Sequence, residues 1–158
     1  MHGTGTFRWN EKSFYKGDWV DNLKEGNGKM VFKDESSYEG QWKADKPHGQ
    51  GTMKWADNTS YTGAWEDGKR NGKGICTYTD ESSYNGDFVN NIKSGQGKIT
   101  FKDQSWYDGA WHDDTMNGQG IFHWANNNEY NGMFVKGKIT VGVLKTDKNI
   151  TRKIKQEL

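Results

Sequence analysis

The sequence predicts an all-β fold, namely a single-layer, twisted antiparallel β-meander built from 23-residue hairpin repeats. A tyrosine recurs every 23 residues, and a glycine follows two residues after each one. Aromatic residues make up 14% of a chain that is only 31% hydrophobic. Self-similarity at a fixed spacing indicates an array whose units are stable only when stacked on their neighbours. The six tyrosines are Tyr15, Tyr38, Tyr61, Tyr84, Tyr107 and Tyr130.

Each repeat, numbered from its tyrosine as position 0, predicts two strands. Positions 0, 2 and 4 share one face in Tyr15, Gly17 and Trp19, and a period of two is typical of a strand with one buried face. A loop of about six residues is expected next, followed by Gly-x-Gly at positions 11 and 13 and by the second strand through positions 15 and 17. A short polar turn, such as residues 33–36, then leads to the next tyrosine. This pattern predicts roughly twelve strands and a ribbon on the order of 55 Å long.

The aromatic residues fall into columns at positions 0, 4 and 17, and these columns are the predicted core. A glycine in a strand lets a ring from the adjacent strand lie over bare backbone, so we expect the glycines to seat the rings. Only Phe14 and Trp106, each directly before a tyrosine, lie outside the columns and position 15. The single cysteine, Cys76, occupies position 15, which predicts a buried apolar residue and not a nucleophile.

The amino-terminal residues predict an edge strand, because residues 3–14 match only the second half of a repeat. An exposed edge can pair with another chain, so Gly3, Gly5, Phe7 and Trp9 are the predicted edge-pairing residues. A homodimer, a docked partner or a loss of upstream repeats would each explain this half repeat.

The carboxy-terminal residues depart from the repeat after Phe134, because positions 11 and 13 would be Val141 and Val143. Residues 139–144 predict a capping strand. Isoleucine or leucine then recurs every fourth residue at 150, 154 and 158, which predicts a short amphipathic helix that caps the last hairpin or anchors a membrane or partner. The terminal residues 155–158 resemble an ER-retrieval signal, which matters only in a chain that enters the ER.

Two regions follow from this pattern, a repeat array over residues 3–135 and a divergent cap with a basic tail over residues 136–158. The array contains the half repeat, five whole repeats and a partial one. Their ranges are 3–14, 15–37, 38–60, 61–83, 84–106, 107–129 and 130–135.

The motif Tyr-x-Gly-x-Trp, followed seven residues later by Gly-x-Gly, resembles the MORN (membrane occupation and recognition nexus) family over residues 3–135. The resemblance implies a docking or assembly module in cytoskeletal, ciliary or myosin-linked complexes, with dimerisation or lipid binding in some members. Many MORN units carry Asp-Gly in the hairpin turn. This chain carries pairs such as Asp34-Glu35 and Asp57-Asn58 there, so we expect a different or longer turn.

The sequence offers no constellation for catalysis, metal binding or a cofactor, so we expect no enzyme and no cofactor. The four histidines stand at unrelated repeat positions. Residues 63–69 and 132–138 imitate a phosphate-binding loop, but Arg70 and Ile139 stand where a Ser or Thr would hold Mg²⁺. The net charge of +1 gives no reason to expect a nucleic-acid partner, and no run of residues suggests a signal peptide or a membrane span.

Three classes of function remain. The first is a non-enzymatic scaffold, cytoplasmic and associated with the cytoskeleton or a cilium, which binds a helical or extended segment of a partner protein. Its predicted groove residues are Tyr38, Trp42, Tyr61, Trp65, Tyr84, Phe88, Tyr107 and Trp111. The second is peripheral binding to anionic phospholipid through a basic ridge on the loop edge, formed by Lys24, Lys46, Lys69, Arg70 and Lys93. The third, implied by the family resemblance, is an accessory module of a lipid kinase or methyltransferase.

Overall fold

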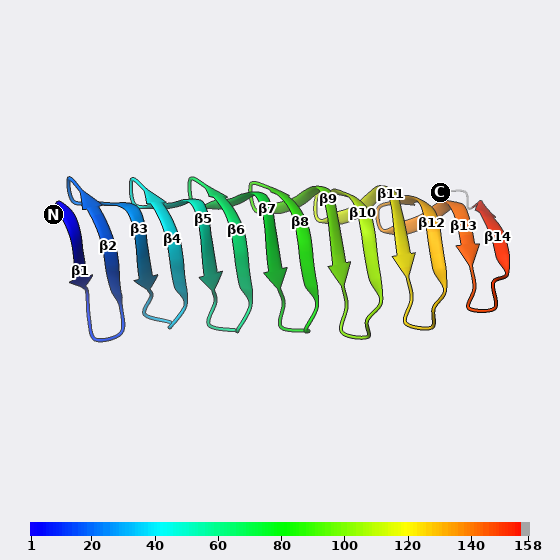
Figure 1. Ribbon diagram of the computed structural model, residues 1–158, viewed down its shortest axis with the longest axis horizontal. Helices are drawn as coiled ribbons and strands as arrows, with labels where there is room; N and C mark the ends of the chain where they lie inside the picture. The colour runs from blue at the N-terminus through cyan, green and yellow to red at the C-terminus, as the bar shows by residue number, and fades with distance from the viewer. Residues whose placement is uncertain (156–158) are drawn as a thin grey trace. The chain divides into compact units, whose positions relative to one another are not determined.

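The computed structural model describes residues 1–155, which contain strands and turns and no helix. The predicted all-β antiparallel meander is confirmed, with fourteen strands that follow one another in chain order (Figure 1). The contacts within the chain define two compact units, Met1–Thr79 and Asp80–Leu158, and each is described by itself.

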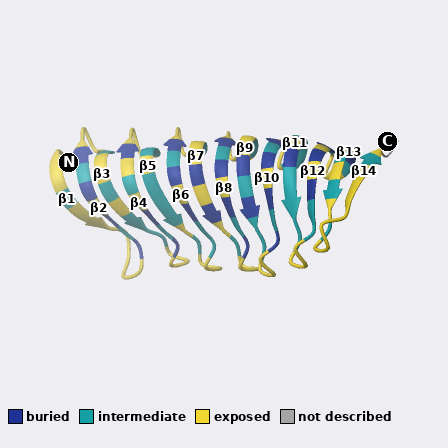
Figure 2. Ribbon diagram, turned by 45° about the vertical axis from the view of Figure 1, so that its right-hand side comes forward, coloured by how far each residue is buried: buried dark blue, intermediate teal, exposed yellow. Residues whose placement is uncertain are grey.

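The first unit contains seven strands, each paired antiparallel with its chain neighbours inside the unit. Buried and exposed residues alternate along its repeat-opening strands, as a one-sided sheet requires (Figure 2). The strands are β1 (Gly3–Arg8), β2 (Phe14–Val20), β3 (Leu23–Val31), β4 (Ser37–Lys43), β5 (Lys46–Lys54), β6 (Ser60–Glu66) and β7 (Lys69–Thr77).

The second unit repeats this arrangement, again with antiparallel pairing between chain neighbours. Its strands are β8 (Ser83–Val89), β9 (Ile92–Thr100), β10 (Trp106–His112), β11 (Thr115–His123), β12 (Glu129–Val135), β13 (Lys138–Lys145) and β14 (Thr151–Lys155).

The repeat tyrosine is seated over two facing glycines, as the sequence predicts. Gly40 pairs directly with Gly51, and a Cβ added to Gly51 would stand 2.2 Å from the Tyr38 hydroxyl oxygen. That hydroxyl donates a 2.9 Å hydrogen bond to the Gln41 carbonyl oxygen, so the ring buries its apolar edge while its polar end stays satisfied. The two glycines are therefore a steric requirement of the buried tyrosine.

The tryptophan at position 4 connects successive repeats. The Trp42 ring makes edge-to-face contacts with Tyr38 of its own repeat at 5.0 Å and with Tyr15 of the previous repeat at 5.3 Å. Its indole N–H donates to the Gly28 carbonyl oxygen at 3.0 Å, also in the previous repeat. Such ring pairs contribute about 0.5–1.5 kcal/mol beyond the area they bury, so the core is a continuous ladder of rings within the unit.

The predicted loops of about six residues are wrong, because two-residue turns close these hairpins. In the turn between β4 and β5, Ala44 and Asp45 both have positive φ, 46° and 67°, which is the backbone of a type I′ turn. The strands flanking the turn extend through most of the predicted loop. The equivalent turns are Asp21-Asn22, Asp67-Gly68, Asn90-Asn91, Asp113-Asp114 and Lys136-Gly137.

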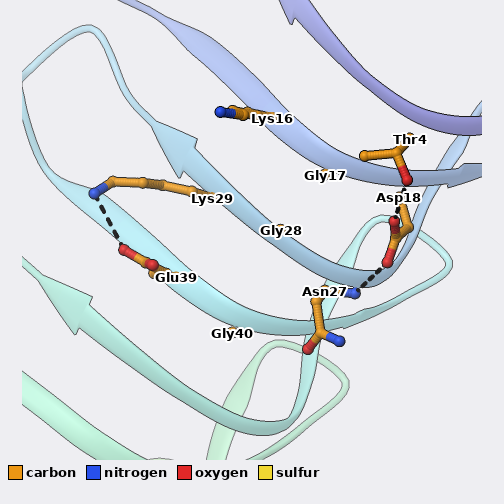
Figure 3. A pocket seen from close by; sticks show the side chains of 9 residues that line it. All are labelled: Thr4, Lys16, Gly17, Asp18, Asn27, Gly28, Lys29, Glu39 and Gly40. Carbon is orange, nitrogen blue, oxygen red and sulfur yellow. Dashed lines mark hydrogen bonds and ion pairs between the residues drawn. The ribbon is translucent and has the colours of Figure 1, made fainter.

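A bulge after each such turn explains the first glycine of Gly-x-Gly. In the first repeat the β2 to β3 register shifts between Gly17 and Asp18, and Gly26 adopts a φ of 63°. The carboxylate of Asp18 fixes the bulge by accepting hydrogen bonds from the Asn27 backbone N–H and the Thr4 hydroxyl, both 2.9 Å (Figure 3). These side chains lie on the face opposite the rings.

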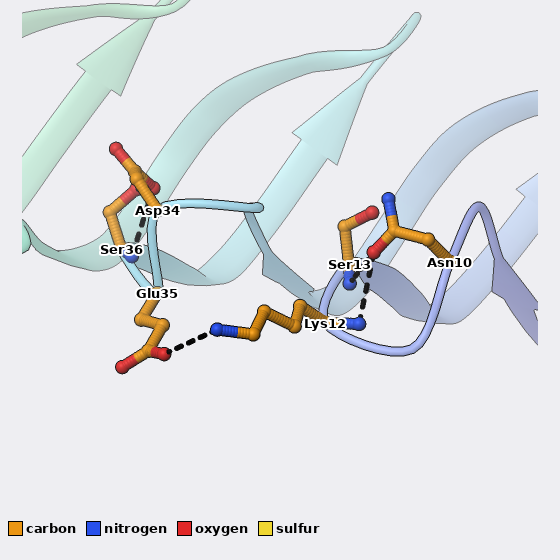
Figure 4. Close-up of polar contacts among 6 residues, drawn as sticks. All are labelled: Asn10, Lys12, Ser13, Asp34, Glu35 and Ser36. Atoms are coloured by element: carbon orange, nitrogen blue, oxygen red, sulfur yellow. Dashed lines mark hydrogen bonds and ion pairs between the residues drawn. The ribbon is translucent and has the colours of Figure 1, made fainter.

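The second type of turn, between repeats, is a three-residue loop closed by an aspartate. The Glu35 N–H donates to the Phe32 carbonyl oxygen at 3.0 Å and Glu35 has a φ of 71°, which fits a type I turn followed by a left-handed residue. The Asp34 carboxylate accepts hydrogen bonds from the Ser36 hydroxyl and N–H at 2.6 and 3.1 Å (Figure 4), and these bonds lower its pKa. The second residue of the Asp34-Glu35 pair is thus the left-handed residue of a three-residue loop.

The carboxy-terminal residues correct two further expectations. Gly142 pairs with Gly132 beside Tyr130, so β13 completes a sixth hairpin whose bulge is shorter by one residue. The predicted helix is wrong where the structure describes it, because residues 151–155 form strand β14 against β13. Leu158 of that helix, and residues 156–158 of the retrieval-like sequence, lie outside the described residues.

Candidate partner-binding face

The eight residues predicted to line a partner groove form the buried floor of the aromatic face. In the first unit Tyr38 and Tyr61 are fully buried, and Trp42 and Trp65 are only 5% and 7% exposed. In the second unit Tyr84, Phe88, Tyr107 and Trp111 are equally buried. Their direct contact with a partner stays a prediction, and the accessible atoms of this face belong to other residues.

The floor is chemically inert as well as buried. Desolvation raises the pKa of Tyr38, Tyr61 and Tyr107 to about 12, so these phenols remain neutral at physiological pH. The hydroxyls of Tyr61 and Tyr107 donate to the carbonyl oxygens of Ala64 and Ala110 at 2.9 and 2.8 Å. These groups hold the sheet together and offer no acid or base.

Much of the accessible apolar surface of this face comes from residues at positions 15 and 17, apart from the buried Cys76 and Ile99, and we call these accessible residues the apolar row. Sequence reasoning assigned them to the core, but Phe7 and Trp9 are 41% and 48% exposed and the others named here are half-buried. In the first unit the apolar row comprises Phe7, Trp9, Met30, Phe32, Met53 and Trp55. In the second unit Phe122 contacts Phe101 at 6.2 Å and Trp124 at 4.8 Å.

All five residues of the predicted basic ridge lie on strands and not in loops, and their contact with a lipid or an acidic partner stays a prediction. Lys24 is 16% exposed, pairs with Asp45 at 2.9 Å and places its Nζ 5.3 Å from the centre of the Trp42 ring. Lys93 similarly stands 4.6 Å above Trp111. These cations cover the rings of the aromatic face and are not a solvated ridge.

Of the other three residues, Arg70 lies on the aromatic face, whereas Lys46 and Lys69 are exposed. Arg70 lies 5.7 Å from the centre of the Tyr61 ring and donates to the Cys76 sulfur at 3.7 Å, so it also belongs to the aromatic face. Lys46 and Lys69 are exposed at the first positions of β5 and β7. The five residues therefore differ in exposure and in what surrounds them.

The four predicted edge residues lie where the sequence places them. Gly3, Gly5 and Phe7 are on β1 and Trp9 directly follows it, and β1 has β2 as its neighbour. The Phe7 and Trp9 rings contact each other at 4.9 Å. Pairing of this edge with another chain stays a prediction.

On the opposite face of the first unit, a depression of about 540 Å³ is lined by polar residues such as Lys16, Asp18, Lys29 and Glu39 (Figure 3). Lys29 pairs with Glu39 at 3.1 Å, so this surface carries mixed charge.

The described residues form neither a metal-binding group nor a nucleotide-binding loop. Across residues 1–155 no three His, Cys, Asp or Glu residues come together as a metal-binding group. The two loops that imitate a phosphate-binding motif contain the type I′ turns Asp67-Gly68 and Lys136-Gly137, and Cys76 is buried as predicted. Within that same range no helix has the length and apolar character needed to cross a membrane.

Comparison with known proteins agrees with the repeat geometry. The family model for the MORN repeat matches six consecutive segments, residues 1–13, 15–37, 38–60, 61–83, 84–106 and 107–129. A comparison with curated proteins finds no match.

Among solved structures, the chain is similar to the TCP domain of Drosophila melanogaster SAS-4, seen in complex with a proline-rich motif of Ana2. The TM-score is 0.57 at 12% identity, over 91% of this chain and 78% of the other. At this identity the likeness is one of fold alone.

Proposed function

The chain belongs to the MORN-repeat family, and on that premise we propose that it is a non-enzymatic scaffold that binds a segment of a partner protein on its aromatic face. The observation that carries this proposal is the apolar row, whose rings stay half-exposed while the rings beside them are buried. Aromatic side chains held open on a rigid surface are the usual anchors of protein recognition.

The chemistry of the apolar row indicates which kind of segment it would bind. Phe32 and Trp55 stand on successive repeats at the same position, so a partner running across the strands would meet one ring in each repeat. Lys24 stands beside the row, with its Nζ 5.9 Å from the centre of the Trp9 ring. An extended or helical segment with apolar anchors fits this surface.

The structural neighbour adds support for a protein partner, because the SAS-4 domain of similar fold is seen with a proline-rich motif. We therefore include proline-rich segments among the partner sequences to be tested. We further propose that the complex forms in the cytoplasm, in a cytoskeletal or ciliary assembly, as the family resemblance implies.

Affinity capture from a cell extract, followed by binding measurements with the captured partner, tests the proposal. Trp55→Ala removes a half-exposed ring of the apolar row and is expected to weaken binding by at least about tenfold. Ile75→Ala is the matched control, because Ile75 is a large apolar residue, 48% exposed, on the opposite face. Equal affinity of both variants for the partner would contradict the proposal.

Trp42→Ala is not a suitable probe of binding, because the buried Trp42 ring joins two tyrosines. Its loss is expected to lower stability by about 3–5 kcal/mol, which would remove binding for an unrelated reason. The chosen variants avoid this ambiguity.

Peripheral binding to anionic phospholipid is the alternative function. Lys24, Arg70 and Lys93 contact rings, so Lys46 and Lys69 would have to provide much of the attraction. Reversal of both to Glu is then expected to abolish co-sedimentation with anionic vesicles, and unchanged sedimentation would argue against this surface.

A further inference from the structure

The outer side of β1 carries a ring seat that is empty. In the hairpins that follow, the glycine at position 13 lies under a tyrosine, and a Cβ on Gly28 or Gly51 would stand 2.2 Å from the hydroxyl oxygen of Tyr15 or Tyr38. Gly5 occupies the same repeat position, yet a Cβ added there meets only the Met1 Cε, at 3.8 Å. Within the described residues, no tyrosine lies over Gly5.

The backbone of β1 has the geometry of the second strand of a repeat. Gly3 has a φ of 88°, in the left-handed region used by the bulge glycines Gly26 and Gly49. The Met1 carbonyl oxygen accepts a 2.9 Å hydrogen bond from the Asn22 N–H, as the Lys24 carbonyl oxygen does from Asp45 one repeat later. Residues 1–8 therefore have the backbone geometry of repeat positions 9–16, which form the second strand of a hairpin.

Apolar side chains beside the seat are exposed at the same edge. Phe7 corresponds to Met30, which pairs with the ring-bearing Tyr15 in the next hairpin, but Phe7 remains 41% exposed. The Trp19 indole donates to the Gly5 carbonyl oxygen at 3.4 Å, a longer bond than the 3.0 Å bond from Trp42 to Gly28. A ring added over Gly5 would cover Phe7 and shield the hydrogen bond between Trp19 and Gly5.

We propose that the outer edge of β1 binds a strand of the form Tyr-x-Gly-x-Trp or Tyr-x-Gly-x-Phe from another polypeptide, by antiparallel strand addition. The register follows from the β2 to β3 pairing, in which Tyr15 faces Met30 and Gly17 faces Gly28. The incoming glycine lies opposite Gly5, and the incoming tyrosine lies opposite Phe7 with its ring over Gly5. Main-chain hydrogen bonds then provide affinity, and the ring seat provides sequence specificity.

A second folded copy of this chain is a poor source of the strand. In the first unit, β2, β4 and β6 carry the motif, and each already pairs on both sides. The occupant we infer is a MORN-type first strand that another protein exposes at its own edge.

A synthetic peptide copying residues 60–68 is the probe, because it contains Tyr61, Gly63 and Trp65 in the required order. Titration into the isotopically labelled full chain is expected to shift the backbone amide signals of β1, with a dissociation constant below about 1 mM. A peptide with Tyr61→Ala, and one with Gly63→Val, should each bind at least about tenfold more weakly, a loss of roughly 1.4 kcal/mol.

The matched protein variants are Gly5→Val, which fills the seat, and Thr6→Val, which changes the neighbouring residue on the opposite face. Gly5 does not have a positive φ, and a Cβ there meets only the flexible Met1 side chain at 3.8 Å, so the first variant should retain the melting temperature of the parent. Loss of peptide binding in Gly5→Val but not in Thr6→Val supports the proposal.

Three results would overturn the proposal. They are no shift of β1 signals at millimolar peptide, equal binding by Gly5→Val and Thr6→Val, and a stable β1-mediated homodimer that the peptide does not displace. The strand site shares Phe7 with the apolar row, but none of these results involves Trp55, the residue that tests the scaffold proposal, so that proposal can fail or succeed separately.

Discussion

Replacing Gly51 with alanine tests the ring seat directly, because the added Cβ would stand 2.2 Å from the hydroxyl oxygen of Tyr38 and 2.5 Å from its Cζ. The fully buried ring must move. Overpacking of this kind costs about 1–3 kcal/mol, and losing the hydroxyl bond to Gln41 adds about 0.5–1.5 kcal/mol. The smaller entropy of an unfolded chain with alanine offsets about 0.4–1 kcal/mol. We expect a net loss of about 2–3 kcal/mol in the free energy of unfolding.

Gly5→Ala is the control for this prediction, because Gly5 stands at the same repeat position with an empty seat. It should leave stability unchanged or raise it by up to about 1 kcal/mol. Urea denaturation followed by circular dichroism measures both variants, with each unfolding transition fitted separately because repeat arrays can lose two-state behaviour. If the two variants differ by less than about 0.5 kcal/mol, the ring seat does not account for the regular spacing of glycine and tyrosine within this chain.

Three further predictions concern the turns and the ionisable groups. Ala44→Asn should raise the free energy of unfolding by about 0.5–1 kcal/mol, because Asn adopts the left-handed φ of a type I′ turn more readily, whereas Ala56→Asn, at a position without positive φ, should not. Alkali should unfold the protein between about pH 10 and 12, because burial raises the pKa of the repeat tyrosines. Their contribution to stability is present below the pKa of a tyrosine in the unfolded chain and is lost as pH rises toward the folded pKa. Tyrosinate absorbance that appears near pH 10 with an unchanged circular dichroism spectrum would contradict this. The tyrosines concerned are Tyr15, Tyr38, Tyr61 and Tyr107, each raised to about 12. Acid should lower the stability of the protein below about pH 4, because hydrogen bonds from the Ser or Thr two residues later lower the pKa of the turn aspartates, and their contribution to stability is lost as pH falls. Replacing all of these aspartates with Asn should flatten the dependence of melting temperature on pH in this range. Asn can take this place because Asn126 already accepts the equivalent backbone hydrogen bond at 3.1 Å. These aspartates are Asp34, Asp57, Asp80 and Asp103.

The repeated hairpins could be predicted from the sequence because the packing of a tyrosine over glycines requires particular residues at fixed spacings. A tyrosine such as Tyr38 can lie over backbone only where Gly40 and Gly51 leave room, so the ring and its seat must recur together. The spacing of these residues therefore predicts both the pairing of strands and the identity of the buried face.

The two-residue turns were missed because the bulge adds residues between the turn and the Gly-x-Gly motif. Trp42 faces Pro47 and Gly40 faces Gly51 across the β4 to β5 hairpin, so residues 48–50 of β5 stand opposite the single residue Gln41, and the connection appears longer in the sequence than the turn is. Asp67-Gly68 is a typical type I′ pair and was the available signal. It was interpreted only as part of an imitation phosphate-binding loop.

The exposed residues of the aromatic face could not be separated from the buried ones by residue type. Trp55 and Trp42 are both tryptophans in regular columns, but only Trp42 is enclosed by tyrosines on two repeats. The predicted groove therefore named the floor and omitted the apolar row. Which column is covered depends on the neighbouring repeat.

The wrong helix has an equally simple origin. Ile150 and Ile154 are four residues apart, and four is close to one helical turn but also a multiple of the strand period. The free side of β13 offers hydrogen bonds to residues 151–155, and this pairing determines the outcome. Tertiary context overrides local spacing here.

The tryptophan contacts between repeats have a consequence for how such a protein can change in length. Trp42 depends on Tyr15 and Gly28 of the repeat before it, and Trp65 depends in the same way on Tyr38 and Gly51. A duplicated block of 23 residues inserted between these repeats would therefore meet a correct neighbour at both of its ends. Gene duplication or deletion by whole repeats can lengthen or shorten the binding surface without any compensating substitution, whereas a change of another length would disturb the ring contacts of the repeat that receives it.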